Sequence, residues 1–198
     1  MGKIIGLTGG IATGKSSVSK MLQKKGFEVV DADQIVYDLQ QKGQSLLKEM
    51  TKTFGLTILN EDGSLNRGAL GNVIFGDPSA RAKLEELIHP EVKKECIRRM
   101  SEFSGDVLFL DVPLLFEAGF DDLTDGNVVV CAAKETQMKR LMLRDKRNIA
   151  DAQMRIDAQM PLADKIAQAD YVINNDGDMD LLAANVEKFL KNLKGKGD

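Results

Sequence analysis

Tryptophan is absent from this chain of 198 residues, and aromatic residues of all kinds make up only 5% of it. Because single-stranded nucleic acid is commonly bound by stacking its bases on aromatic side chains, this scarcity removes the usual stacking platforms. Charge of one sign is also lacking, since 27 lysines and arginines face 30 aspartates and glutamates and leave a formal net charge of −3. Such a balance gives no general attraction to nucleic acid or to an anionic membrane, so we expect neither as a partner.

Long hydrophobic runs are missing too, and no stretch approaches the ~20 consecutive apolar residues that a membrane span requires. The first residues do not show the charged-then-apolar pattern of a secretory signal, so we expect a cytoplasmic protein. The two cysteines, Cys96 and Cys131, lie far apart without metal-ligand spacing, which predicts two reduced thiols. The chain also has no Asn-Lys-x-Asp guanine-recognition sequence, no Cys-x-x-Cys metal cluster and no Gly-x-Ser-x-Gly nucleophile elbow.

What the sequence does contain is a phosphate-binding loop. Residues 9–16, Gly-Gly-Ile-Ala-Thr-Gly-Lys-Ser, fit the pattern of a glycine, four residues and Gly-Lys-Ser/Thr, with an apolar run (4–7) before it and a helix-compatible run (16–22) after it. Glycine lets successive backbone N–H groups turn inward on a polyphosphate, and the following helix presents its positive dipole end to the same anion. Lys15 would reach the outer phosphates and the Ser16 hydroxyl would ligate Mg²⁺. A chance glycine-rich turn is the alternative; the matching flanks argue against it and predict a protein that handles a nucleoside triphosphate.

Five apolar, β-rich runs recur along the chain and are separated by helical patterns. They are Lys3–Thr8, Phe27–Asp31, Val107–Asp111, Asn127–Cys131 and Tyr171–Asn174. Runs this continuous are typical of strands buried on both faces, as in a parallel sheet. Their alternation with helices predicts a three-layer α/β fold, whose ligands gather beyond the carboxyl ends of the strands.

Two stretches depart from this alternation. From Asp33 to about Phe103 helical patterns follow one another without a strong strand, and Asp77-Pro78 is typical of a helix N-cap followed by proline. This stretch predicts a helical insertion that is long enough to form a substrate-binding subdomain. Residues 139–165 hold seven lysines and arginines against four aspartates and glutamates. The charge pattern alone favours a solvated helix face, but the presence of the phosphate loop favours a basic element that closes over phosphates. We expect three functional parts: a nucleotide-binding core at 1–32, 104–138 and 166–194, a helical substrate subdomain at 33–103, and a lid at 139–165.

Two carboxylates follow predicted strands. Asp33 lies two residues beyond the second strand, where a carboxylate can orient an acceptor hydroxyl and take its proton during phosphoryl transfer. A helix N-cap is the alternative role for Asp33, and Asp31 would serve equally well as that cap. Asp111 ends the third strand, in a pattern that fits an aspartate beside the Mg²⁺ shell as well as a structural strand-end residue. The mostly apolar residues 112–117 that follow would line a pocket or fold back as core.

Arginines in the basic stretch are candidates for stabilising the transferring phosphoryl group, an effect worth ~10³–10⁵ in rate. Arg140 and Arg144 lie four residues apart and are expected on one helix face, and the same spacing predicts a shared face for Arg155 and Gln159. The sequence does not say which arginine reaches the phosphate. The single histidine, His89, precedes a proline and is therefore expected at a helix–helix junction, as a turn residue rather than a catalyst.

The chain resembles one family, the dephospho-coenzyme A kinases, in five segments that lie in order over nearly its whole length. They are residues 6–11 with the loop, 30–33 (Val-Asp-Ala-Asp), 88–90 (Ile-His-Pro), 111–117 (Asp-Val-Pro-Leu-Leu-Phe-Glu) and 155–162 (Arg-Ile-Asp-Ala-Gln-Met-Pro-Leu), the last continuing to Lys165 and Ala169-Asp170. The resemblance implies a P-loop kinase fold: a three-layer α/β architecture with a parallel five-stranded sheet, a helical insertion that binds the coenzyme and a basic lid. It also implies that ATP, with Mg²⁺, phosphorylates the ribose 3′-hydroxyl of dephospho-coenzyme A, the last step of coenzyme A biosynthesis.

Site residues follow from this resemblance together with the strand-end pattern. Asp33 matches the general base that is proposed for the family, and Asn174-Asn175 resembles the segment near the adenine pocket. The expected catalytic residues are Asp33, Lys15 and Arg140, and the expected metal ligand is Ser16. The expected ATP-binding residues are Gly10, Ile11, Ala12, Thr13, Gly14, Lys15, Ser16, Ser17, Arg144 and Asn175. The expected substrate-binding residues are Asp33, His89, Asp111, Pro113, Leu114, Leu115, Arg155 and Gln159.

The chain departs from the family pattern in two places. Ser17 stands where threonine is commoner, which keeps the hydroxyl, and the lid has no Leu-Thr-Glu-Glu run, which leaves its individual contacts open. Two other functions compete with phosphorylation of dephospho-coenzyme A. One is that of another P-loop kinase, acting on a nucleoside monophosphate or shikimate, and the other is that of a nucleotide-dependent switch or assembly protein. The Asp-x-Pro-Leu-Leu and His-Pro segments argue against the former, and an acceptor base at Asp33 argues against the latter. We expect a monomer or a small homo-oligomer.

Overall fold

The computed structural model describes residues 2–146 and 148–195, and the chain forms two compact units. One unit combines Met1–Val30 with Phe103–Asp198, and the other is Asp31–Glu102. Each unit has a hydrophobic core of its own. The expected division into a nucleotide core, a substrate subdomain and a lid is a division by function, and it stays a prediction.

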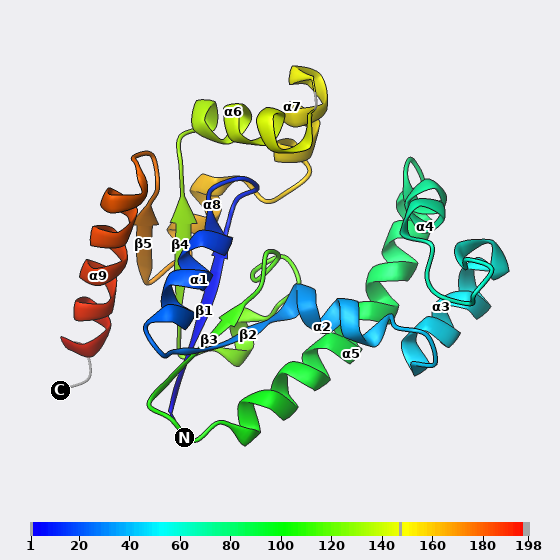
Figure 1. Ribbon diagram of the computed structural model, residues 1–198, viewed down its shortest axis with the longest axis horizontal. Coiled ribbons are helices and arrows are strands. Elements are labelled where there is room, and N and C mark those ends of the chain that lie inside the picture. Colours follow the sequence, from blue (N-terminus) through cyan, green and yellow to red (C-terminus); the bar gives the residue numbers. More distant parts are fainter. Residues whose placement is uncertain (1, 147, 196–198) are drawn as a thin grey trace. The chain divides into compact units, whose positions relative to one another are not determined.

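A five-stranded sheet forms the centre of the first unit (Figure 1). Its strands are β1 (Lys3–Gly9), β2 (Glu28–Asp31), β3 (Val107–Asp111), β4 (Gly126–Cys131) and β5 (Tyr171–Asn174). They lie in the order β2-β3-β1-β4-β5; β1 pairs in parallel with β3 and β4, and β4 pairs in parallel with β5. The predicted strands and the α/β fold class are therefore confirmed. Because β1 is the middle strand, the phosphate loop that follows it leaves the sheet from the centre of its carboxyl edge.

Helices pack on this sheet through buried aliphatic side chains. The helices of the first unit are α1 (Lys15–Lys24), α6 (Lys134–Asp145), α7 (Ile149–Asp157), α8 (Leu162–Ala167) and α9 (Met179–Gly195), with a short 3₁₀ turn, η2 (Asp121–Leu123). Helix α9 contacts α1 and β5, and α8 contacts β4. Val18 and Leu22 of α1 and Val186 of α9 are fully buried in one core with Phe109 and Val130 of the sheet. This packing fixes α1, and with it the end of the loop, on the sheet.

The second unit is helical. It consists of α2 (Ala32–Leu39), α3 (Ser45–Phe54), the 3₁₀ turn η1 (Leu56–Ile58), α4 (Arg67–Ile74) and α5 (Pro78–Glu102). Helix α5 contacts α2, α3 and α4, so it is the element on which the unit is assembled. The predicted start of α5 is confirmed, because Asp77 Oδ1 accepts hydrogen bonds from the N–H groups of Ser79 (2.9 Å) and Ala80 (3.1 Å) and Pro78 is the first helical residue.

The expectation that His89 lies in a turn is wrong. Both His89 and Pro90 lie inside α5, a continuous helix of 25 residues. A proline in a helix interior removes one backbone donor and crowds the preceding turn, at a cost of ~3 kcal/mol or more. The helix continues because the turns on both sides are held by packing: Leu84 before the pair lies in the core of the unit, and Val92 after it is buried. Tertiary contacts therefore override the local preference of the His-Pro pair.

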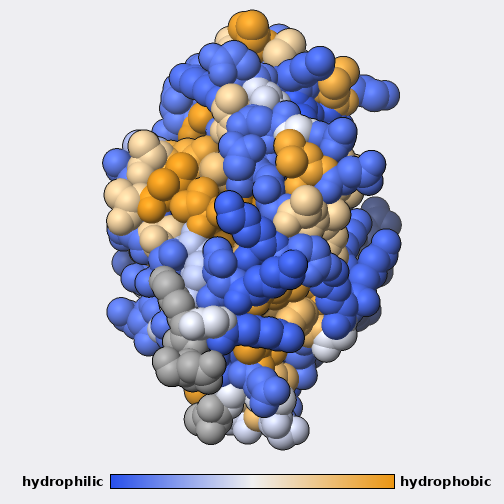
Figure 2. All heavy atoms as spheres, turned by 90° about the vertical axis from the view of Figure 1, so that its left-hand side faces the viewer, coloured by the Kyte–Doolittle hydropathy of each residue, from blue (hydrophilic) through white to orange (hydrophobic). Residues whose placement is uncertain are grey.

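The surface carries many charged groups. None of the helices within the described ranges combines the length and the apolar composition that crossing a membrane requires. Figure 2 shows a largely hydrophilic face on which apolar side chains form separate groups.

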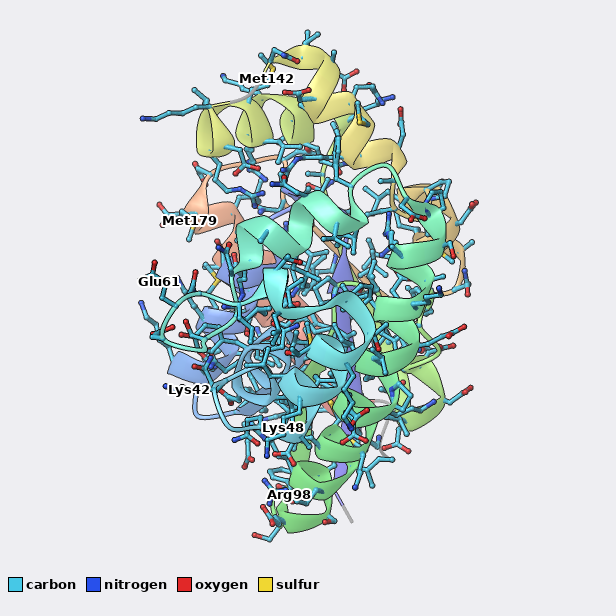
Figure 3. All side chains as sticks on the ribbon, turned by 90° about the vertical axis from the view of Figure 1, so that its right-hand side faces the viewer. Lys42, Lys48, Glu61, Arg98, Met142 and Met179 are labelled. Carbon is cyan, nitrogen blue, oxygen red and sulfur yellow. The ribbon has the colours of Figure 1, made fainter. Side chains whose placement is uncertain are left out.

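An ion-pair network lies on the helical unit. Arg98 of α5, labelled in Figure 3, contacts Glu95 at 2.8 Å and Glu102 at 2.5 Å. Arg99 joins Glu95 (2.9 Å) to Asp38 of α2 (3.3 Å), and this network links two helices of the helical unit.

Candidate active site

The phosphate-binding loop turns sharply between β1 and α1. Thr13 makes two hydrogen bonds to the carbonyl oxygen of Gly10, one from its N–H (3.2 Å) and one from its hydroxyl (2.8 Å). Gly14, directly before α1, has a φ of +93°, and a Cβ at this position would lie 2.1 Å from Nδ2 of Asn175. Both the left-handed backbone and this close approach therefore require glycine at position 14. Ala12 also has a positive φ, +60°, a strained conformation of the kind that clusters at functional sites.

Two side chains hold the carbonyl oxygen of Thr13. Buried Asn175 donates to it from Nδ2 at 2.7 Å, and Arg140 of α6 donates from Nη1 at 3.5 Å. Because the C=O and the following N–H of a trans peptide point in opposite directions, this arrangement turns the N–H of Gly14 the other way. Gly14 has no side chain to cap α1, and although the N–H of Ser17 donates to the carbonyl oxygen of Gly14 at 2.9 Å, the start of the helix is left accessible to an anion at Lys15 and Ser16. The loop thus has the form that binds a polyphosphate.

Lys15, the first residue of α1, forms an ion pair with Asp111 at the end of β3. Asp111 is buried, with an exposed fraction of 2%. A buried carboxylate is costly unless a cation compensates it, and Lys15 supplies that charge. A triphosphate in the loop would compete with Asp111 for the same ammonium group. Both alternatives for Asp111, a place beside Mg²⁺ and a structural strand end, fit this position.

The arginines of the basic stretch lie in two settings. Arg140 reaches the loop through its contact with Thr13. Arg144 donates two hydrogen bonds to the carboxylate of Asp145 (2.8 and 3.2 Å), and Arg155 of α7 lies 3.5 Å from the same carboxylate. The hydrogen bond from Arg144 to Asp145 raises the pKa of the Arg144 guanidinium. Of the three arginines that the structure describes in this stretch, one therefore contacts the phosphate loop, and the other two share an acidic partner in α6.

Gln159 contacts the loop from an unexpected position. The prediction that it shares a helix face with Arg155 is wrong, because α7 ends at Asp157. Its side-chain Oε1 accepts a hydrogen bond from the N–H of Ile11 at 2.8 Å. A pocket of about 490 Å³ opens beside this contact, between the loop, Gln137 of α6 and the segment 156–166. Gln159 therefore connects the end of the expected lid to the phosphate loop, and its role in binding substrate stays a prediction.

The segment after Asp111 is partly core. Leu115 is fully buried, whereas Pro113 and Leu114 are half-buried. The carbonyl oxygen of Pro113 accepts a hydrogen bond from the hydroxyl of Thr8 in β1 at 3.0 Å. Of the two possibilities considered for this segment, Leu115 follows the one in which the chain folds back into the core, and contacts with a substrate stay a prediction for all three residues.

In the helical unit, Asp31 is the N-cap of α2. Its Oδ1 accepts hydrogen bonds from the N–H groups of Asp33 (2.9 Å) and Gln34 (3.2 Å). The capping alternative for Asp33 is therefore wrong, and Asp33 lies in the first turn of α2 with an exposed side chain. His89 is half-buried within α5. The roles of Asp33 as acceptor base and of His89 in substrate binding stay predictions.

Sequence reasoning missed several polar contacts around the loop. Lys165 of α8 is fully buried and bonds to the carbonyl oxygen of Pro113 and to Glu117. Asp176, after β5, accepts a hydrogen bond from the N–H of Ala133 at 2.6 Å, which is the main cause of the lowered pKa of its carboxyl group. No local signal marks Lys165 as buried, because it follows the charged residue Asp164 in a short helix.

The loop offers oxygen ligands to a divalent cation. Ser16 in the first turn of α1 and Asp111 at the end of β3 carry oxygen donors of the kind that Mg²⁺ prefers. Within the described residues, no group of three or more His, Cys, Asp or Glu side chains forms a ready metal cage. Mg²⁺ at a nucleotide is usually held by one or two protein oxygens together with waters and phosphates, so these residues fit it.

Comparison with known proteins identifies the family. The family model described as dephospho-CoA kinase matches residues 3–180. The chain is 42% identical over 196 residues to the dephospho-CoA kinase of Anaeromyxobacter dehalogenans, covering 98% of this chain and 93% of that one, and 44% identical over 194 residues to that of Listeria monocytogenes, covering 96% and 97%. The solved dephospho-CoA kinase from Campylobacter jejuni matches with a TM-score of 0.75 and 27% identity over 99% of this chain and 100% of that one. The chain therefore belongs to the dephospho-CoA kinase family.

Proposed function

We propose that this chain transfers the γ-phosphoryl group of ATP to the 3′-hydroxyl of the ribose of dephospho-coenzyme A, giving coenzyme A and ADP, the last step of coenzyme A biosynthesis. The observation that carries the proposal is the phosphate loop, in a chain of this family. The loop precedes the start of α1, which has no side-chain cap, and Lys15 is the first residue of that helix. The competing assignments, a kinase for a nucleoside monophosphate or shikimate and a nucleotide switch, do not agree with that family membership.

The loop binds and orients the triphosphate. Its amide groups and the dipole of α1 favour the negative charge of the phosphates, and they are fixed before the substrate arrives. Asn175 keeps the Thr13 carbonyl oxygen turned away from this anion. Such preorganised donors stabilise charge that develops on the phosphoryl oxygens without any reorganisation at the moment of transfer.

Lys15 and Arg140 supply mobile positive charge. Lys15 exchanges its contact with Asp111 for the outer phosphates when ATP binds, and its ammonium compensates the charge on the leaving group. Arg140 is the arginine that already contacts the loop, which favours it as the residue that stabilises the transferring phosphoryl group. Arg144 is proposed as an ATP contact that first has to leave Asp145.

Asp33 is proposed as the general base. Its carboxylate accepts the proton of the ribose 3′-hydroxyl as that oxygen attacks the γ-phosphorus, and the bond to the β-phosphate oxygen breaks as ADP leaves. Asp31 serves as the cap of α2, so the Asp33 side chain is not needed for that structural task. His89, Arg155 and the residues of the 113–115 segment are proposed to bind the acceptor.

A magnesium ion completes the proposed ATP site. Ser16 and Asp111 would hold it, and when bound it neutralises charge on the phosphates and orients them. The same chemistry needs no protein cage, because the triphosphate contributes ligands of its own. A monomeric or small oligomeric state and a cytoplasmic location remain predictions from the sequence.

The experiment that tests this function combines an acceptor panel with product analysis. The chain is incubated with ATP and Mg²⁺ and with dephospho-coenzyme A, AMP, shikimate or no acceptor, and ADP release is followed in each case. We expect turnover with dephospho-coenzyme A alone, and phosphorus NMR of the product should show the new phosphate on the 3′-oxygen of the ribose. Acceptor-independent hydrolysis, or a phosphate on another hydroxyl, would refute the proposal.

A further inference from the structure

Among the described residues, two charged side chains are buried, those of Lys165 and Asp111. Lys165 has an exposed fraction of 0%, and Asp111 is the partner of Lys15 in the phosphate loop. Burying an ammonium group is costly, and replacing a buried ion pair by apolar residues is often neutral or stabilising. The place of Lys165 in α8 thus calls for an explanation other than stability, and its contacts supply one.

The first contact of Lys165 fixes the turn that follows Asp111. Its Nζ donates to the carbonyl oxygen of Pro113 at 2.9 Å, and the Thr8 hydroxyl donates to the same oxygen at 3.0 Å. A carbonyl oxygen has two lone pairs, and here both have a donor. One donor comes from β1 and the other from α8, so the chain two residues after Asp111 is held between two rigid elements.

The second contact of Lys165 reaches the end of the expected lid. Its Nζ lies 2.8 Å from Oε1 of Glu117, and the same oxygen accepts a hydrogen bond from the N–H of Met160 at 3.2 Å. The neighbouring residue, Gln159, accepts the N–H of Ile11 in the phosphate loop. A single ion pair therefore joins the segment after Asp111 to the segment that contacts the loop.

We propose that the Lys165–Glu117 pair positions the phosphate loop for transfer from two sides. On one side it sets the turn after Asp111, which aligns the partner of Lys15. On the other side it sets Met160, and through the adjacent residue the contact with the Ile11 amide. Lys165 and Glu117 are positioning residues, and the inference rests on the proposed phosphoryl transfer only for its effect on rate.

The test compares removal of the whole ion pair with removal of Lys165 alone. In Lys165→Met the Glu117 carboxylate loses its cation, so both the stability and the kcat should fall. In Lys165→Met/Glu117→Gln no unpaired charge remains, so stability should recover. The glutamine, however, lacks the anchor that Lys165 gives to Glu117, so its contact with the N–H of Met160 is loosened. The kcat should stay about 10²-fold below wild type, because misplacing reacting groups by ~1 Å costs that much, while the KM for ATP stays close to wild type.

A matched control removes an exposed ion pair of the same unit. Lys25, the residue directly after α1, pairs with Glu187 of α9 at the surface, and their side-chain exposed fractions are 35% and 50%. The variant Lys25→Met/Glu187→Gln should keep the kcat of the wild type, because surface pairs contribute little. A fall equal to that of the buried double variant would mean that any loss of an ion pair slows the enzyme, which overturns the inference.

A second readout is independent of activity. Hydrogen exchange of the Ile11 amide should be faster in Lys165→Met/Glu117→Gln than in wild type, while the Leu7 amide in β1 keeps its protection. A double variant with wild-type kcat, or with an unchanged Ile11 exchange rate, overturns the inference and leaves the pair a structural role. A wild-type chain inert toward dephospho-coenzyme A overturns the proposed function instead, and the exchange experiment still decides the positioning role.

Discussion

Replacing Gly14 by alanine tests how the loop is built. Two costs arise at this position. The left-handed backbone, with a φ of +93°, disfavours any residue with a Cβ by about 1–2 kcal/mol. The new methyl group would also lie 2.1 Å from Nδ2 of Asn175, so that the amide must move and its 2.7 Å hydrogen bond to the Thr13 carbonyl oxygen is lost. A lost bond to a buried acceptor costs about 1–3 kcal/mol, which gives about 2–5 kcal/mol in total.

Gly26 provides the matched control for this substitution. Its φ is +85°, but nothing lies within 4 Å of the position that a Cβ would take. The variant Gly26→Ala should therefore show only the backbone cost, about 1–2 kcal/mol. The difference between Gly14→Ala and Gly26→Ala isolates the clash with Asn175.

Urea unfolding followed by far-ultraviolet circular dichroism measures these free energies, provided that the slope of the transition stays constant. A double-mutant cycle adds the decisive comparison: in an Asn175→Ala background, Gly14→Ala should cost no more than Gly26→Ala does in the wild type. Equal destabilisation by Gly14→Ala and Gly26→Ala in the wild-type background would refute the close contact. ATP binding, measured by calorimetry, should weaken in Gly14→Ala and not in Gly26→Ala.

Four further predictions concern charge and chemistry. Lys15→Ala should lower turnover by at least ~10²-fold because charge on the phosphates is left uncompensated, whereas Lys25→Ala should not; single-turnover kinetics at saturating ATP decide this. Asp33→Asn should cut kcat by ~10²–10⁴-fold and leave the ATP affinity unchanged in calorimetry, and a loss of affinity alone would mean a different role. Hydrogen bonds from two arginines of α5 lower the pKa of Glu95 from 4.5 to about 2. Its stabilisation is therefore present above pH 4.5, declines below it and is lost as the pH falls through 2; in urea titrations Glu95→Gln should cost about 1 kcal/mol at pH 7 and progressively less as the pH falls below 4.5. Burial raises the pKa of Cys96 to about 12, so a thiol reagent at pH 8 should label it only after unfolding.

The elements with strong local signals were predictable from the sequence. The continuous apolar runs gave the strands, because strands of a parallel sheet are buried on both faces and need no alternation. Asp77-Pro78 gave the start of α5, since the cap and the first helical position have their own residue preferences. The glycine pattern gave the loop, whose left-handed Gly14 follows from the same requirement.

The failures occurred where distant contacts decide the outcome. The His-Pro pair predicts a turn, but the packing of Leu84 and Val92 keeps α5 continuous across it. The spacing of Arg155 and Gln159 predicts a shared face only if the helix lasts that long. A signal against this was present, because Pro161 disfavours a helical conformation of the residue before it.

The buried contacts of the site were beyond reach of pattern reasoning. Lys165 counted as one of seven basic residues in a stretch that was expected to face solvent or phosphate. Its partners, the Pro113 carbonyl oxygen and Glu117, come from a segment about 50 positions earlier in the chain, and no spacing rule relates the two. The choice between Asp31 and Asp33 as the helix cap likewise needed the hydrogen bonds themselves.

The order of the strands in the sheet has a consequence for folding during synthesis on the ribosome. Lys3 of β1 pairs with Val107 of β3, and Ile5 of β1 pairs with Gly126 of β4. At translation speeds of ~5–20 residues per second, the first strand waits on the order of 10 seconds for both neighbours. During this interval the emerging segment 31–102 already carries a hydrophobic cluster of its own, so it can begin to fold first. ATP can then bind and stabilise the nascent chain only late in its synthesis, and truncated translation products that lack these strands should not bind ATP.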